Sequence, residues 1–117
     1  MNVETVIYHN PRCSKSRQTL ALLEERGISP SVVEYLKVGV DGAQLERIIG
    51  MLGQEASTLL RKKEDAYASS GLDDSSGVAE IVAAIVKEPV LLERPIVIRG
   101  ERAALGRPPE NILSILE

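Results

Sequence analysis

The N-terminal third of the chain switches between extended and helical patterns, which restricts the folds open to it. Residues 3–8 are short, β-branched and apolar-biased, as in a buried strand. Leu20 and Leu23 then recur at helical spacing, and Gly27 supplies a helix stop. Residues 31–35 return to a strand pattern. A strand, a helix and a strand in such a short stretch predict two parallel strands joined by a right-handed crossover.

The rest of the chain predicts a helical segment followed by a hairpin. The expected elements are, in order, a helix over 41–53 that begins with a capping box of Asp41 and Gln44, a short helix over 55–61, a loop over 65–77, a helix from Val78 that Pro89 ends, strands over 95–99 and 102–105, and a last helix from Pro108. The fold class is therefore α/β, with the order β-α-β, helical insertion, β-β-α. The length fits a single domain over residues 1–117.

Composition excludes several classes of function. Hydrophobic residues make up 44% of the chain and charged residues 26%, as in ordinary globular proteins, and the formal net charge is −3. Three tyrosines are the only aromatic residues, so the core is aliphatic and base stacking has little to use. No apolar run approaches the roughly 20 residues that cross a bilayer. With no signal-peptide pattern and one cysteine, we expect a cytoplasmic monomer without nucleic-acid or membrane partners.

The single cysteine, Cys13, lies between the first expected strand and the first expected helix. A thiol at a helix N-terminus is near unpaired backbone N–H groups and the positive end of the helix dipole, and both favour the reactive thiolate. Arg12, Lys15 and Arg17 add positive charge. The alternative is a buried cysteine that only fills space. The cationic helix start favours the nucleophile.

Two neighbours of Cys13 bear on its chemistry. Ser16 stands where a C-x-x-C site has its second cysteine, so an oxidised or adducted Cys13 must be cleared by a thiol from another molecule. Ser16 itself either contacts the substrate or caps the helix. His9 either lowers the thiol pKa when protonated, orients a water or backbone group when neutral, or is a strand-end histidine bonded to backbone. His9 and Cys13 alone cannot complete a typical zinc site, so we expect no metal.

Three arginines stand at predicted element boundaries: Arg61, Arg94 and Arg107. The planar guanidinium donates two parallel hydrogen bonds, which suits a tetrahedral oxyanion. Each arginine is alternatively an ordinary solvated side chain. The Arg94–Pro95 bond opens a strand and is either cis, exposing backbone groups to a ligand near Cys13, or the trans start of an edge strand.

Four segments in order, residues 9–17, 59–61, 93–97 and 106–109, resemble the ArsC family of glutaredoxin-dependent arsenate reductases and their relatives. The resemblance implies a thioredoxin-like fold with a helical insertion. It also implies roles for individual residues: Cys13 as the nucleophile on arsenate, His9 assisting thiolate formation, Arg61, Arg94 and Arg107 around the oxyanion, and Pro95 as a cis proline before the third strand.

The resemblance further implies the partners of the reaction. Arsenate is the substrate, and glutathione and glutaredoxin are external reductants, with no bound cofactor. Ser14 and Lys15 follow the nucleophile where well-studied arsenate reductases tend to have Gly-Thr. Two alternatives stay open. One is an Spx-like regulator that binds RNA polymerase, although its redox-sensing members usually carry C-x-x-C. The other is a thiol reductase acting on another substrate, such as a glutathionylated protein.

Overall fold

The computed structural model describes residues 4–116 and divides into two compact units. The first, here called the sheet unit, combines the chain up to Tyr35 with the chain from Arg94 onward. The second, the helical unit, is Leu36–Glu93. The expectation of a single domain over residues 1–117 stays a prediction.

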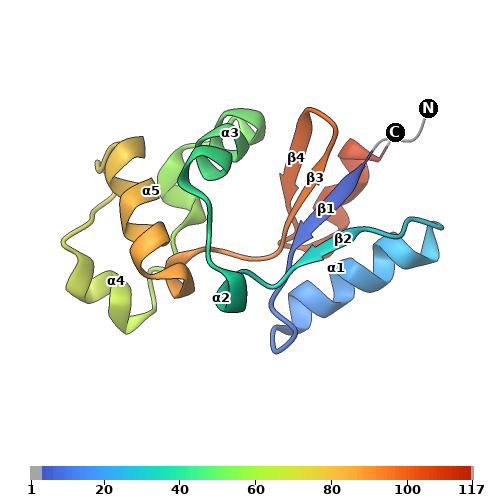
Figure 1. Ribbon diagram of the computed structural model, residues 1–117, viewed down its shortest axis with the longest axis horizontal. Helices are drawn as coiled ribbons and strands as arrows, with labels where there is room; N and C mark the ends of the chain where they lie inside the picture. The colour runs from blue at the N-terminus through green and yellow to red at the C-terminus, as the bar shows by residue number, and fades with distance from the viewer. Residues whose placement is uncertain (1–3, 117) are drawn as a thin grey trace. The chain divides into compact units, whose positions relative to one another are not determined.

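The sheet unit is built on four strands: β1 (Thr5–Tyr8), β2 (Ser31–Val33), β3 (Ile96–Arg99) and β4 (Arg102–Leu105). Their order across the sheet is β2-β1-β3-β4 (Figure 1). β1 and β2 are parallel, as predicted, and helix α1 (Ser14–Glu25) connects them. β3 is antiparallel to both β1 and β4. Val3, which the sequence pattern included in the first strand, lies outside the described residues.

The core of the sheet unit is aliphatic, as the composition requires. Ile7 of β1 and Val97 of β3 pack with Leu23 of α1. Ile112 and Ile115 come from the C-terminal 3₁₀ helix η3 (Pro109–Ile115), so α1 and η3 share one face of the sheet. Burying each such side chain is worth about 1.5–3 kcal/mol, enough to fix α1 against the strands. The predicted last helix is thus present, in 3₁₀ form.

The helical unit contains α3 (Gly42–Leu52), α4 (Asp65–Ser70) and α5 (Val78–Lys87), with the 3₁₀ helices η1 (Ala56–Leu59) and η2 (Pro89–Leu91). The predicted cap of α3 is present, because Gln44 N–H donates to Asp41 Oδ1 at 3.1 Å. Gly53 ends α3 with φ of 66°, in the left-handed region that glycine tolerates. In the described residues, no helix is long and apolar enough to cross a membrane.

Two local predictions were wrong. Residues 65–77 were expected to form a loop, yet Asp65–Ser70 is helix α4, with an acid in its first turn and Gly71 at φ 78° after its end. The second strand ends at Val33, because the short helix α2 (Tyr35–Val38) begins where a strand was expected to continue. Tyr35, the first residue of α2, is fully buried, so the apolar pattern at this position reflects burial and not a strand.

Candidate active site

Cys13 lies where the chain leaves β1 and enters α1. The N–H of His9 still donates to the carbonyl of Val33 at 2.9 Å, which extends the parallel pairing by one residue. The chain then turns, and Cys13 N–H donates to the Asn10 carbonyl at 2.9 Å. Cys13 is the N-cap of α1, and its carbonyl accepts from Arg17 N–H at 3.0 Å. The thiol therefore stands at the helix start, where the first N–H groups lack partners within the helix.

The surroundings of Cys13 favour the thiolate. The residue is 8% exposed, and burial raises the pKa of its thiol. The backbone N–H of Ser16, the charge and side chain of Arg94, and the backbone N–H of Lys15 act in the opposite direction. Their combined effect exceeds that of burial, so the pKa of Cys13 lies below its ordinary value. These surroundings favour a nucleophile over a core filler, and the catalytic role of Cys13 stays a prediction.

Two of the three predicted arginines meet at this thiol. Arg107 Nη1 lies 3.9 Å from Cys13 Sγ and also donates to the Arg94 carbonyl at 3.2 Å. The Arg94–Pro95 and Arg107–Pro108 peptide bonds are both cis. The Pro95 carbonyl accepts from Gly106 N–H at 2.8 Å, so that oxygen is engaged within the protein. Pro95 precedes an inner strand, not an edge strand, and its contact with a ligand stays a prediction.

His9 and Ser16 form a buried pair behind the nucleophile. His9 Nδ1 lies 2.6 Å from Ser16 Oγ, which also accepts from Asn10 N–H at 3.0 Å. Burial lowers the pKa of His9; the charge of Glu34 raises it and that of Arg17 lowers it, and the result is below the ordinary value. His9 is therefore neutral near pH 7. Ser16 fastens the loop before α1 through its hydroxyl, while its predicted contact with substrate stays a prediction.

Arg61 belongs to the helical unit. Its N–H donates to the Leu91 carbonyl at 2.8 Å, and its guanidinium forms an ion pair with Glu64 at 2.6 Å. Its role at an oxyanion stays a prediction.

Sequence reasoning missed a close contact that supports the site. A Cβ on Gly106 would lie 2.7 Å from Thr19 Oγ1 and 2.8 Å from Pro95 Cγ, distances that real Cβ atoms do not adopt. Only glycine lets the chain after β4 pass this close to α1 and to Pro95. The signal was available, because Gly106 directly precedes Arg107 in one of the segments quoted above.

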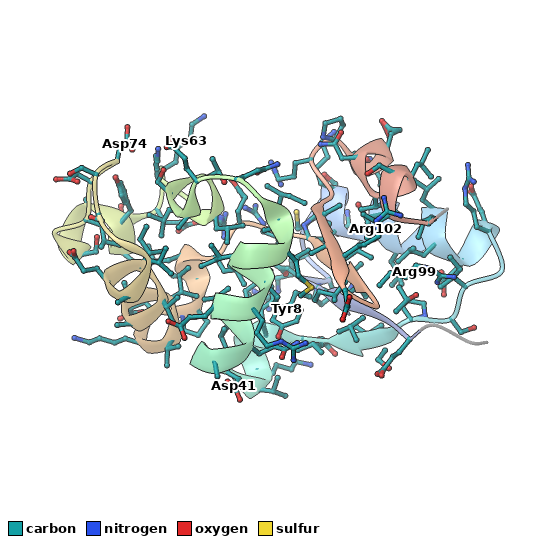
Figure 2. The ribbon with its side chains drawn as sticks, turned by 90° about the horizontal axis from the view of Figure 1, so that it is seen from above. Tyr8, Asp41, Lys63, Asp74, Arg99 and Arg102 are labelled. Atoms are coloured by element: carbon teal, nitrogen blue, oxygen red, sulfur yellow. The ribbon has the colours of Figure 1, made fainter. Side chains whose placement is uncertain are left out.

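Other arginines of the sheet unit lie away from the thiol. Arg99 and Arg102, labelled in Figure 2, flank the β3–β4 turn. The register pairs Arg99 with Thr5, at the end of β1 opposite to His9. Arg99 Nη1 donates to Thr5 Oγ1 at 2.6 Å, and Arg102 donates to a carbonyl of η3. These two guanidinium groups are structural.

The arrangement suits attack by a thiolate on an anionic, oxygen-rich electrophile. Backbone N–H groups and two guanidinium groups at one thiolate offset negative charge both on the sulfur and on an incoming anion. Across residues 4–116, no cluster of three or more His, Cys, Asp or Glu side chains could hold a metal ion. Cys13 is the chain's one thiol, so a second must come from another molecule.

Comparison with known proteins agrees with the resemblance seen in the sequence. Residues 8–115 match the model of the ArsC family. The "Uncharacterized protein YfgD" of Escherichia coli (strain K12) is 48% identical over 118 residues, covering 99% of both chains. An "Arsenate reductase" of Haemophilus influenzae is 45% identical over 116 residues, covering 97% of this chain and all of the relative. The solved "Arsenate reductase from Vibrio cholerae" superimposes with a TM-score of 0.91 at 44% identity, over 98% of this chain and 99% of that one. The fold is thioredoxin-like, as in these neighbours, and the chain belongs to the ArsC family.

Proposed function

We propose that this chain is an arsenate reductase that reduces arsenate to arsenite, with glutathione and glutaredoxin as reductants. The observation that carries the proposal is a thiolate-favouring Cys13 with Arg107 Nη1 at 3.9 Å from its sulfur. Relatives named arsenate reductase match the chain over nearly its whole length, which supports arsenate as the substrate. These reductants belong to the cytoplasm, where glutathione keeps thiols reduced, and we propose that compartment.

Binding of arsenate would rest on charge and on fixed donors. The N–H groups at the start of α1 lie beside Cys13, the N-cap residue, and a helix N-terminus binds oxyanions through such groups. Arg94 and Arg107 supply two guanidinium groups at the same thiol. Arg61 is proposed as the third.

The first chemical step would form a bond between Cys13 Sγ and arsenic. The thiolate attacks arsenate, one arsenic–oxygen bond breaks, and the leaving oxygen departs as water after taking up protons. Arsenic stays pentavalent in this adduct. The guanidinium groups offset the negative charge that gathers on the remaining oxygens as the transition state forms.

The second step would transfer the electrons. A glutathione thiolate attacks Cys13 Sγ, a sulfur–sulfur bond forms, and the electron pair of the sulfur–arsenic bond leaves with arsenic as arsenite. Arsenic gains two electrons and the two sulfurs lose them as the mixed disulfide forms. Glutaredoxin then takes the glutathione by thiol–disulfide exchange and returns Cys13 to the thiolate. Since Ser16 occupies the place of a resolving cysteine, the chain cannot clear this disulfide itself.

The deciding experiment replaces Cys13 by serine. We expect Cys13→Ser to abolish arsenite formation with glutathione and glutaredoxin while its thermal unfolding stays close to that of the unchanged protein. Full activity in this variant would sink the mechanism. If the unchanged protein turns over no arsenate, the Spx-like regulator and the reductase of another substrate remain, and co-purification of stoichiometric RNA polymerase from lysate separates them.

A further inference from the structure

The surface around Cys13 carries three basic side chains that the proposed mechanism does not use. Arg12, Lys15 and Arg17 are all exposed, in contrast to Cys13 and Ser16 between them. We propose that these three, here called the cationic rim, recognise the carboxylates of the thiol that resolves Cys13. The inference rests on the proposed function and adds to it the residues that select glutathione among thiols.

The distribution of charge along α1 is the reverse of what helix stability favours. Lys15 and Arg17 stand in the first turns, with no acidic residue in the first turn, whereas Glu24 and Glu25 end the helix. A cation at a helix N-terminus opposes the helix dipole and is unfavourable. In α5, by contrast, Glu80 is in the first turn and Lys87 in the last. The charges of α1 therefore do not serve its own stability, and the uses that remain for them are to favour the Cys13 thiolate and to bind an anion.

The rim is held close to the nucleophile. Arg17 Nη1 donates to the Pro11 carbonyl at 2.9 Å, which fixes this guanidinium over the loop before Cys13. The charge of Arg17 also lowers the pKa of His9, so its field reaches the interior of the site. At a rise of about 1.5 Å per residue, Lys15 and Arg17 lie within about 6 Å of Cys13 along the helix axis, less than the Debye length in physiological salt.

No carboxylate within residues 4–116 forms an ion pair with any of the three rim side chains. Among the described acids, Glu34 acts on the site by raising the pKa of His9. The rim thus presents positive charge to solvent around a thiol that must react with a second thiol. Glutathione carries two carboxylates and one ammonium group, so its net charge is negative before its thiol ionises. An attacking thiolate and an arsenate adduct repel each other, and cations beside them reduce that repulsion.

The size of the effect follows from Coulomb's law. One charge pair about 8 Å apart in water is worth about a two- to threefold change in rate. Removing Lys15 and Arg17 together should therefore slow a reagent with one negative charge about four- to ninefold, and speed one with one positive charge by the same factor. An uncharged reagent should be unaffected once the thiolate fraction is equal.

The test needs no arsenate. Cys13 is reacted separately with glutathione disulfide, net negative, and with cystamine, net positive. In both reactions the thiolate attacks one sulfur, forms a new disulfide and expels one thiolate, and mass spectrometry follows the adduct. The rates are compared for the unchanged protein, Lys15→Gln, Arg17→Gln and the double variant. Alkylation by uncharged iodoacetamide across pH corrects each variant for its thiolate fraction.

Arg26→Gln is the matched control. It removes the same charge from the other end of the same helix, and Arg26 is also exposed. It lies about 16 Å from Lys15 along the axis, which is beyond a Debye length of about 8 Å. We expect the ratio of the glutathione disulfide rate to the cystamine rate to fall at least about fourfold in each rim variant at low salt. The fall should become smaller as salt is added, and the ratio should stay unchanged in Arg26→Gln.

An unchanged ratio in both rim variants, or an equal fall in Arg26→Gln, would overturn the assignment. The outcome is independent of arsenate turnover, so a protein inactive on arsenate that still shows the charge preference would refute the proposed function and leave the rim as a recognition surface for an acidic thiol.

Discussion

Replacing Gly106 by alanine would place a methyl group where the chain after β4 passes between α1 and Pro95. That Cβ would lie 2.7 Å from Thr19 Oγ1, 3.2 Å from Thr19 Cγ2 and 2.8 Å from Pro95 Cγ. Gly106 N–H donates to the Pro95 carbonyl at 2.8 Å, so the backbone cannot shift without stretching that bond. The φ of Gly106 is not in the left-handed region, so the effect of the substitution comes from space alone.

Overpacking of this kind costs about 1–3 kcal/mol of the free energy of unfolding, and two rigid neighbours favour the upper half of that range. The strain also acts on the site. Gly106 is hydrogen-bonded to Pro95 and directly precedes Arg107, which in turn donates to the Arg94 carbonyl. Arg94 directly precedes Pro95, and its charge lowers the pKa of Cys13. We therefore expect Gly106→Ala to raise the thiol pKa toward its ordinary value and to reduce reductase activity.

Urea denaturation measures the stability, and the pH profile of iodoacetamide alkylation measures the thiol pKa. Gly50→Ala is the matched control, because a Cβ at this exposed site in α3 meets nothing within 4 Å. It should stabilise the protein by about 0.5–1 kcal/mol. Thr19→Ala removes two of the three close contacts, so in that background the cost of Gly106→Ala should fall by about 0.5–3 kcal/mol. A cost below about 0.5 kcal/mol, or one unaffected by Thr19→Ala, would refute the steric reasoning.

Three further outcomes are expected. Ser16→Ala leaves His9 Nδ1 and Asn10 N–H without their buried partner, and should cost about 1–3 kcal/mol in urea denaturation. Burial depresses the pKa of His9, so its neutral form stabilises the fold fully above about pH 6.5, and that contribution is lost as the pH falls below this value. In His9→Asn, the unfolding free energy should depend less on pH below about 6.5. Arg94→Gln should shift the alkylation profile of Cys13 to higher pH. An unchanged profile would show that Arg94 does not lower the pKa of the thiol.

The regular elements were predictable where one local signal dominated. β-branched runs marked β1, β2 and β3, the turn at Gly100 and Glu101 marked the return into β4, and Asp41 with Gly53 marked both ends of α3. Helix α4 was missed, because its Ser and Asp residues are common in loops. The features that favour the helix are weak: Asp65 near the positive end of its dipole and Gly71 as its C-cap.

The predicted hairpin already implied that Arg94 and Arg107 lie close together. Strand β3 pairs with β4 through Ile96 and Leu105. Arg94 lies two residues before Ile96, and Arg107 lies two residues after Leu105. The pairing of β1 with β3, which brings this hairpin end to Cys13, joins segments far apart in sequence. No local pattern fixes that contact, because it depends on which strand edges find each other in the folded sheet.

The source of the thiolate's stability also decides over what pH range the nucleophile works. A protonated His9 would support the thiolate only below its own pKa, which burial depresses, and the support would vanish near neutrality. The groups that lower the pKa of Cys13 are instead backbone N–H groups and the guanidinium of Arg94. His9 contacts Ser16, whose hydroxyl also accepts from Asn10 N–H in the loop before α1, so we expect His9 to position this loop. The thiolate fraction should then rise with pH and not be lost as a histidine deprotonates.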